Sequence, residues 1–257
     1  MIHFILETKE VFSMGTVIAV TSGKGGTGKT SVTGAVAASL AMMGRSVLCI
    51  DMDIGLRNLD ISLGLNDRAL MDFSDVALGR CPLSRAAVTH PTLKNLSLLT
   101  APMSLPASLT AERVRALLNT ARTMYDYILI DSPAGLGAGF RLAICGADRA
   151  LVIATNDASS LRDAQRTVTE LDHIRQVHLV MNRIQPKLLR KLRTTIDDAM
   201  NTAGLPLMGV VPEDPQVMLC ANLGLPLATR PKKGAALACW NIALRIEGQQ
   251  VPIMRIR

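Results

Sequence analysis

Short apolar runs recur along the chain and are separated by longer amphipathic segments. The runs that predict strands cover residues 16–21, 46–51, 95–101, 126–131, 149–155, 177–182 and 207–212. Their apolar residues are consecutive rather than alternating, which is typical of strands buried on both faces. Strands that alternate with helices predict a parallel sheet. We therefore expect a single-domain α/β fold, with a mostly parallel sheet of seven or eight strands and helices on both faces.

The segments between these runs carry apolar residues at helical spacing. The first spans residues 32–43, and Gly44 is expected to end it. The second spans 110–125, with Thr110 as its expected N-cap. In the third, one helix face is predicted from Leu161, Ala164, Val168, Leu171 and Ile174. A further helix is expected around residues 240–246, with its apolar face on the sheet.

Composition excludes several classes of protein. The chain has 257 residues, 49% of them hydrophobic, which suits one domain that buries about three quarters of its unfolded surface. The formal net charge of +7 can favour nucleic acid or anionic lipid but selects neither. Aromatic residues make up only 3%, which argues against base-stacking RNA modules. The five cysteines form no C-x-x-C pair, so we expect buried thiols in a reducing cytosol.

Residues 1–13 lack the pattern that begins after Met14. Lys9, Glu10 and Val11 can be encoded by a stretch that resembles a bacterial ribosome-binding sequence just ahead of Met14. We therefore expect translation to start at Met14, so that residues 1–13 are a non-native extension and residues 14–257 form the domain. The alternative is a genuine, disordered N-terminal tail. The chain has no apolar run near the roughly 18 residues of a membrane span.

A glycine-rich loop carries the strongest chemical signal. Residues 23–30 read GKGGTGKT, which matches G-x-x-x-x-G-K-[ST] between a predicted strand and a predicted helix. Glycines let backbone N–H groups face phosphate oxygens, and the helix dipole adds to the attraction. The Lys29 ammonium is expected to bridge the β- and γ-phosphates, and the Thr30 hydroxyl to bind Mg²⁺. The predicted phosphate-binding residues are Gly23, Lys24, Gly25, Gly26, Thr27, Gly28, Lys29 and Thr30.

The loop contains a second lysine, Lys24. With it, the loop resembles the deviant phosphate loop K-G-G-x-G-K-T of the MinD/ParA ATPases. Five further stretches resemble the MinD branch of that family: DMDIGLRNLDISLGL (51–65), DSPAGL (131–136), TNDASSLRDAQR (155–166), NRI (182–184) and GVVPEDPQV (209–217). The resemblance covers residues 14–252. It implies a P-loop ATPase that dimerises with ATP, hydrolyses it with Mg²⁺, and positions septum-site or polar machinery.

The resemblance also implies roles for single residues. Lys24 would reach the nucleotide of a second subunit and neutralise charge there, as an arginine finger does. Asp53 would orient or activate the attacking water. Asp131 would hold Mg²⁺ through water, with Asp51 near the metal. For Asp51 and Asp131 the alternative is a structural role, in which a strand-end aspartate only caps the following helix.

The remaining implied contacts concern the α-phosphate and the adenine base. Ser31 would touch the α-phosphate, Asn182 would read adenine, and Pro212 and Glu213 would lie near the base. Strand-end asparagines are also common turn formers, so a purely structural Asn182 is the alternative. Arg57 and Asn58 are assigned by the resemblance to a dimer interface or a partner contact.

Two departures from the family pattern concern partners. The family commonly has an acidic residue shortly after D-S-P-A-G, whereas this chain has Gly137 in the run DSPAGLGAGF. The lost charge puts in question the binding of a division inhibitor such as MinC or a MinE-like regulator. The family ends in a basic amphipathic helix, but here only VPIMRIR remains. That is little more than one turn, so we expect weak or no direct membrane binding and a cytoplasmic protein, recruited to the membrane through a partner.

Other functional classes stay open. A ParA-like, DNA-associated positioning ATPase would use the basic stretch RIQPKLLRKLRTTID at residues 183–197, for which a solvated helix face is the simpler explanation. An iron–sulfur carrier scaffold needs paired cysteines that the chain lacks. A metabolic amide or cobalamin-type synthetase is disfavoured by DIGLRNLD at residues 53–60.

Overall fold

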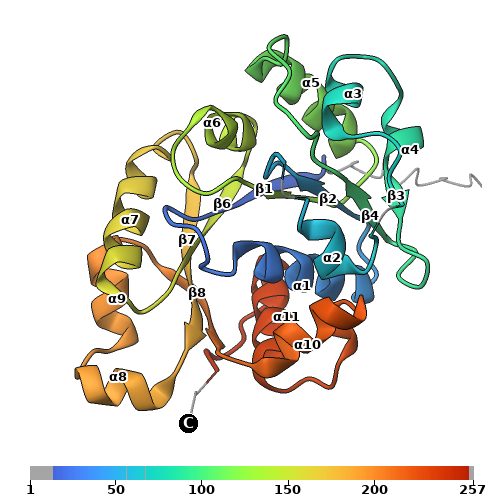
Figure 1. Cartoon of the computed structure of the whole chain (residues 1–257). Helices are drawn as coiled ribbons and strands as arrows, with labels where there is room; N and C mark the ends of the chain where they lie inside the picture. The colour runs from blue at the N-terminus through green and yellow to red at the C-terminus, as the bar shows by residue number, and fades with distance from the viewer. Residues whose placement is uncertain (1–13, 56, 67, 255–257) are drawn as a thin grey trace, which may run out of the picture.

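The computed structural model describes residues 14–55, 57–66 and 68–254, and the predicted extension at residues 1–13 lies outside them. These residues form one eight-stranded sheet with the order β3-β4-β2-β5-β1-β6-β7-β8 (Figure 1). The strands are β1 Thr16–Thr21, β2 Val47–Asp51, β3 Val88–Thr89, β4 Leu96–Leu99, β5 Tyr127–Asp131, β6 Arg149–Ala154, β7 Gln176–Ile184 and β8 Leu207–Pro212. All pairs are parallel except β3 with β4. The predicted α/β class and mostly parallel sheet are confirmed.

Helices cover both faces of this sheet. They are α1 Lys29–Met42, α2 Leu59–Leu63, α3 Phe73–Ala77, α4 Leu83–Ala86, α5 Ala111–Arg122, α6 Ala138–Ile144, α7 Ala158–Thr169, α8 Pro186–Leu192, α9 Ile196–Ala203, α10 Pro215–Leu223 and α11 Gly234–Ile246, with a 3₁₀ turn at Leu227–Thr229. Figure 1 shows α1, α2, α10 and α11 on one side of the sheet, and α3, α5, α6 and α7 on the other. The consecutive apolar residues of β1 serve both layers: Ile18 and Val20 pack toward α1 and α11, whereas Val17 and Ala19 belong to the opposite cores.

Parallel register brings the chemistry to one edge of the sheet. β1 lies between β5 and β6, and Val20 is paired with Asp131. On the other side of β5, Asp51 is paired with the same Asp131. The carboxyl ends of these strands therefore place the glycine-rich loop and both aspartates side by side, as expected for open α/β sheets.

One sequence-based helix boundary needs correction. The expected helix face at residues 161–174 is interrupted, because α7 ends at Thr169. Leu171 and Ile174 are still buried, but they lie in the turns after the helix, where Leu171 donates its N–H to Val168 and Ile174 donates to Leu171. The Thr110 cap of α5 is confirmed, since its side chain accepts from the Arg113 N–H.

The C-terminal segment is tied to the body of the protein by Arg245. Its guanidinium donates to the carbonyls of Val251 (2.8 and 3.0 Å), Pro252 (2.7 Å) and Met208 in β8 (2.9 Å). As predicted, the apolar face of α11 packs on the sheet, where Ile242 and Ile246 are buried. Within the described ranges, no helix is both long and apolar enough to span a bilayer. The end of the tail, residues 255–257, lies outside those ranges.

Candidate active site

The glycine-rich loop ends at Gly28, which is the N-cap of α1 in a left-handed conformation (φ 84°). A Cβ atom there would lie 2.4 Å from Asn182 Nδ2, so this position requires glycine for both its backbone and its neighbour. No side chain caps the N-terminus of α1, and its first turn contains no acidic residue. The first N–H groups of α1 are thus free of side-chain caps, in the arrangement that binds an anion.

The inner end of the loop is buried against Asp131. Lys29 Nζ lies 3.0 Å from Asp131 Oδ1, and the Thr33 hydroxyl, one helical turn after Lys29, donates to the same oxygen at 3.3 Å. Burial raises the pKa of the Asp131 carboxyl, and the Lys29 ammonium and the Thr30 and Lys29 hydrogen bonds oppose that rise. We take the pair to be ionised, because each charge offsets the burial of the other.

The same region contains buried oxygen atoms that make no hydrogen bond within the protein. Asp131 Oδ2 and Thr27 Oγ1 are buried and have no hydrogen-bond partner. A free carboxylate oxygen beside the Thr30 hydroxyl fits Mg²⁺, a cation that is held by one or two protein ligands together with phosphate and water. In the part of the chain that the structure describes, no three His, Cys, Asp or Glu side chains gather as a metal cage. The donor set therefore fits an ion held jointly with the phosphates of a nucleotide.

Asp51 organises the segment that carries Asp53. Its Oδ1 accepts the Asp53 N–H at 2.9 Å and its Oδ2 accepts the Leu59 N–H at 3.2 Å. Burial and the neighbouring Asp131 raise the pKa of Asp51 to about 7. Both Asp51 oxygens are thus engaged with backbone, which is the capping role kept as the alternative above. Its place near the metal, and the water-orienting role of half-buried Asp53, stay predictions.

The outer end of the loop presents Lys24 to its own chain. Lys24 Nζ donates to Ser159 Oγ at 2.8 Å and lies 3.3 Å from Asp157 Oδ1. Asp157 is the N-cap of α7 and accepts the Ser160 N–H. Although burial opposes it, hydrogen bonds from Ser159, Thr155, Ser160 and Lys24 lower the pKa of Asp157 well below its usual value. Sequence reasoning missed Asp157 as a partner of Lys24.

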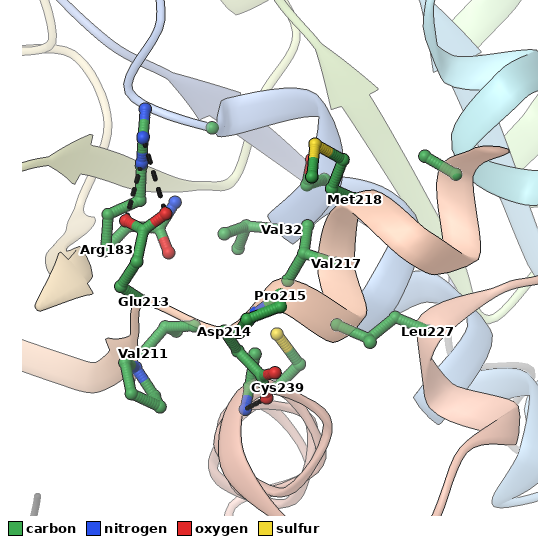
Figure 2. Close-up of a pocket in the computed structure, with 16 residues that line it drawn as sticks. Val32, Arg183, Val211, Glu213, Asp214, Pro215, Val217, Met218, Leu227 and Cys239 are labelled. Atoms are coloured by element: carbon green, nitrogen blue, oxygen red, sulfur yellow. Dashed lines mark hydrogen bonds and ion pairs between the residues drawn. The ribbon is translucent and has the colours of Figure 1, made fainter.

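A mostly apolar cavity of about 430 Å³ opens beside the loop (Figure 2). It brings together Ser31, predicted to contact the α-phosphate, and the three residues predicted near the base: Asn182, Pro212 and Glu213. Its apolar walls, which sequence reasoning did not assign, are Val32, Val211, Val217, Met218, Leu227 and Cys239. Asn182 is buried and donates from Nδ2 to the Thr27 carbonyl at 2.7 Å. The Asn182 amide thus joins the loop to the cavity. The size and the lining of the cavity suit a purine base.

Arg183 is a second residue that sequence reasoning missed. Its guanidinium lies 2.9 Å from Glu213 Oε2, as Figure 2 shows. It also donates to the Gly26 carbonyl at 3.3 Å, so it links the loop to the rim of the cavity. Its backbone is left-handed, with φ 56°, which costs energy in a residue with a Cβ atom. Only its position directly after Asn182, at the end of a strand, could have drawn attention to it.

Comparison with known proteins agrees with this geometry. A family model described as an AAA domain matches residues 15–185. The septum site-determining protein MinD of Synechocystis is 38% identical over 246 residues, which cover 94% of this chain and 92% of the relative. The MinD protein of Helicobacter pylori is 40% identical, over 95% of each chain. This chain belongs to the MinD family. It is accordingly a P-loop ATPase that uses ATP and Mg²⁺.

Solved MinD structures share the whole fold. MinD in the MinC:MinD complex of Aquifex aeolicus superposes with a TM-score of 0.86 at 35% identity, covering 94% of this chain and 99% of that one. MinD of Pyrococcus horikoshii, solved with Mg-ADP, gives 0.80 at 28% identity, covering 91% and 96%. A ParA family ATPase of Chlorobium tepidum gives 0.78 at only 22% identity, which indicates a shared fold and no more. The MinD interpretation is therefore favoured over the ParA-like alternative.

Proposed function

We propose that this protein is an ATP-dependent dimerising switch that takes part in determining the division site, and that hydrolyses ATP to ADP and phosphate. The observation that carries the proposal is the asymmetry of the phosphate loop. Lys29 is enclosed with Asp131, whereas Lys24 is about half exposed at the outer end of the same loop. One lysine is positioned for the nucleotide of its own chain, and the other is accessible to a second subunit.

The residues divide the work of phosphoryl transfer. The uncapped N–H groups of α1 and Lys29 hold the phosphates, while the Thr30 hydroxyl and the Asp131 carboxylate hold Mg²⁺. When bound, the metal supplies positive charge that neutralises the phosphates. Asp53 orients the attacking water, and Asp51 keeps the Asp53 backbone in place through its N–H. Asn182 and the apolar cavity hold the base and so fix the position of the phosphates.

Lys24 completes the site across the dimer. Its contact with Asp157 joins two side chains that are each about half exposed, so exchanging it for a phosphate costs at most about 1 kcal/mol. Hydrolysis by a lone subunit is then slow, because the charge that Lys24 would neutralise belongs to the partner's nucleotide. Since the dimer forms by mass action, specific activity should rise with protein concentration.

Mixing two inactive variants tests whether Lys24 acts on the partner. Lys24→Ala keeps Asp53, and Asp53→Ala keeps Lys24. A heterodimer then contains one site with its own Asp53 and the Lys24 of the neighbour. If Lys24 acts across the dimer, an equal mixture regains activity that neither variant has alone, up to about a quarter of wild-type activity when the two variants pair at random. If Lys24 serves its own chain, the mixture stays as inactive as each variant alone, and the proposal fails.

For partners, we infer an ATP-dependent homodimer that recruits a division-inhibitor protein, as in the MinC:MinD complex of A. aeolicus. Gly137 has an ordinary backbone (φ −74°, ψ −170°), and an added Cβ would meet nothing within 4 Å. Nothing in the described structure demands glycine there, so Gly137→Glu can restore the acidic residue. A pull-down with a MinC protein, with and without ATP, compares the wild-type protein with Gly137→Glu. Equal capture by the two would refute the idea that the missing acidic residue weakens inhibitor binding.

We further propose a cytoplasmic protein with weak or no direct lipid binding, for which DNA is the less favoured binding surface. The middle of the predicted basic stretch forms α8, in which no residue is buried, while its ends belong to β7 and α9. This supports a solvated helix face. DNA retention that appears only with ATP and weakens steeply with salt would overturn this part of the proposal.

A further inference from the structure

A second cavity, of about 640 Å³, lies at the amino edge of the sheet, opposite the phosphate loop. It forms where β6 and β7 begin and where α11 ends. Its lining includes Arg149, Arg175, His178, Arg245 and Glu247. Arg149 and His178 belong to neighbouring strands, with Arg149 paired to Gln176 and Leu151 paired to His178. The alternation along a strand therefore puts both side chains on the face that α11 covers.

The arginines of this cavity have no acidic partner. Arg149 donates to the Ile246 carbonyl at 3.0 Å, and the contacts of Arg245 are all with backbone carbonyls. Arg175 is exposed, and within the described residues it makes no hydrogen bond or ion pair. Glu247 is the one acidic side chain in the lining, and Arg45, outside the cavity, already pairs with it at 2.7 Å. Three guanidinium groups thus share this space with a single carboxylate, which is paired to Arg45.

Burial acts on the titratable groups of this cavity, and for His178 a neighbouring charge acts as well. Burial lowers the pKa of Arg245, and burial together with the charge of Arg149 lowers the pKa of His178. Both shifts disfavour the charged form, and for His178 the neighbouring positive charge of Arg149 adds to the effect of burial. Burial and Glu247 raise the pKa of Tyr127, also in the lining, to about 12, so its hydroxyl stays protonated. A bound anion would offset the cost of the uncompensated arginines.

We propose that this cavity is a binding site for a phosphate-bearing anion, held by Arg149 and Arg175 with His178 beside them. A guanidinium presents two parallel N–H donors that match two phosphate oxygens, and two such groups in one cavity can share one phosphate. The site is independent of the ATPase assignment, because it lies at the other edge of the sheet and shares no residue with the loop. The phosphate can be that of a small soluble molecule or that of a lipid headgroup.

Calorimetric titration with glycerol 3-phosphate tests the site. The protein is first saturated with Mg-ADP, so that the phosphate loop is filled, and chloride of equal ionic strength serves as the blank. We expect one saturable event, weakened at least about tenfold in Arg175→Gln, since a charge-assisted hydrogen bond to phosphate is lost. Arg113→Gln removes an equal charge from an exposed position of α5 and should leave binding unchanged.

A second arm identifies the source of the phosphate. Co-sedimentation with phosphatidylglycerol vesicles, against phosphatidylcholine vesicles, supports a lipid headgroup if binding falls in Arg175→Gln and not in Arg113→Gln. Saturable binding of glycerol 3-phosphate without vesicle binding supports a soluble ligand. Arg149→Gln gives an independent check, with its circular dichroism compared first because Arg149 also holds the Ile246 carbonyl. Absence of binding in both arms, or equal loss in Arg175→Gln and Arg113→Gln, overturns the proposal.

Discussion

The two ends of the phosphate loop hold the same kind of ion pair in opposite surroundings. Lys29 and Asp131 are 6% and 1% exposed, with 3.0 Å between nitrogen and oxygen. Lys24 and Asp157 are 46% and 48% exposed, with 3.3 Å between them. Breaking a buried ion pair leaves one charged group with neither its partner nor water around it, which is costly. In an exposed ion pair, water can replace the partner of each charged group at little cost. Five residues of sequence thus separate a fixed lysine from one that can change partners.

Lys29→Ala should produce the largest effect. It removes the phosphate ligand and leaves Asp131 buried without its counter-charge, so nucleotide binding and hydrolysis should both be lost. Removing one partner of a buried pair also costs about 3–5 kcal/mol of folding stability. Calorimetry with Mg-ATP and chemical unfolding measure the two effects, with Lys24→Ala as the matched lysine deletion. A Lys29→Ala protein that binds ATP normally would contradict the difference drawn between the two ends.

Lys24→Ala should be next in size: it should impair hydrolysis and dimerisation but spare nucleotide binding and folding stability. Hydrolysis should fall on the order of 10³-fold, the lower range for a charge supplied across a subunit boundary. Monomeric nucleotide binding should be retained, and stability should change by less than about 1 kcal/mol. Sedimentation velocity with ATP should show a loss of dimer. Normal dimerisation together with normal turnover would remove Lys24 from the mechanism.

Asp157→Asn should have the smallest effect, in the opposite direction. It keeps an oxygen that can cap α7 through the Ser160 N–H, but it frees Lys24 from its own chain. ATP-dependent dimerisation should strengthen by up to about fivefold, the equivalent of 1 kcal/mol. The dimer dissociation constant is the measurement, with Asp172→Asn as an exposed charge-matched control. Weaker dimerisation in Asp157→Asn alone would mean that Asp157 supports the dimer rather than competing with it.

What could be predicted from the sequence follows from how local each signal is. The loop, its flanking strand and helix, and the strand-end position of Asp131 depend on neighbouring residues, and the structure brings them together. β3 was missed because two residues of an antiparallel edge strand carry no periodicity. The end of α7 was placed too late because Leu171 and Ile174 keep the apolar spacing after the helix has become turns.

The contacts of Lys24 and Arg183 could not be predicted in the same way. Asp157 is 133 residues from Lys24, and Gly26 is 157 residues from Arg183. Such pairs depend on the order of strands in the sheet, which places the ends of β6 and β7 beside the loop after β1. The sequence supplies the residues, but only the register of the folded sheet decides which of them meet.

Helix α11 connects the two cavities mechanically. Its thirteen residues form a rod about 20 Å long, at 1.5 Å per residue. Ala235 and Cys239, at its beginning, line the cavity beside the phosphate loop. Ile246, at its end, lines the arginine-containing cavity at the amino edge of the sheet. A rigid rod that is displaced at one end must move at the other. If the two occupancies are coupled through it, thermodynamic reciprocity requires that a phosphate at the amino edge alter nucleotide affinity by the same factor by which nucleotide alters the affinity for phosphate.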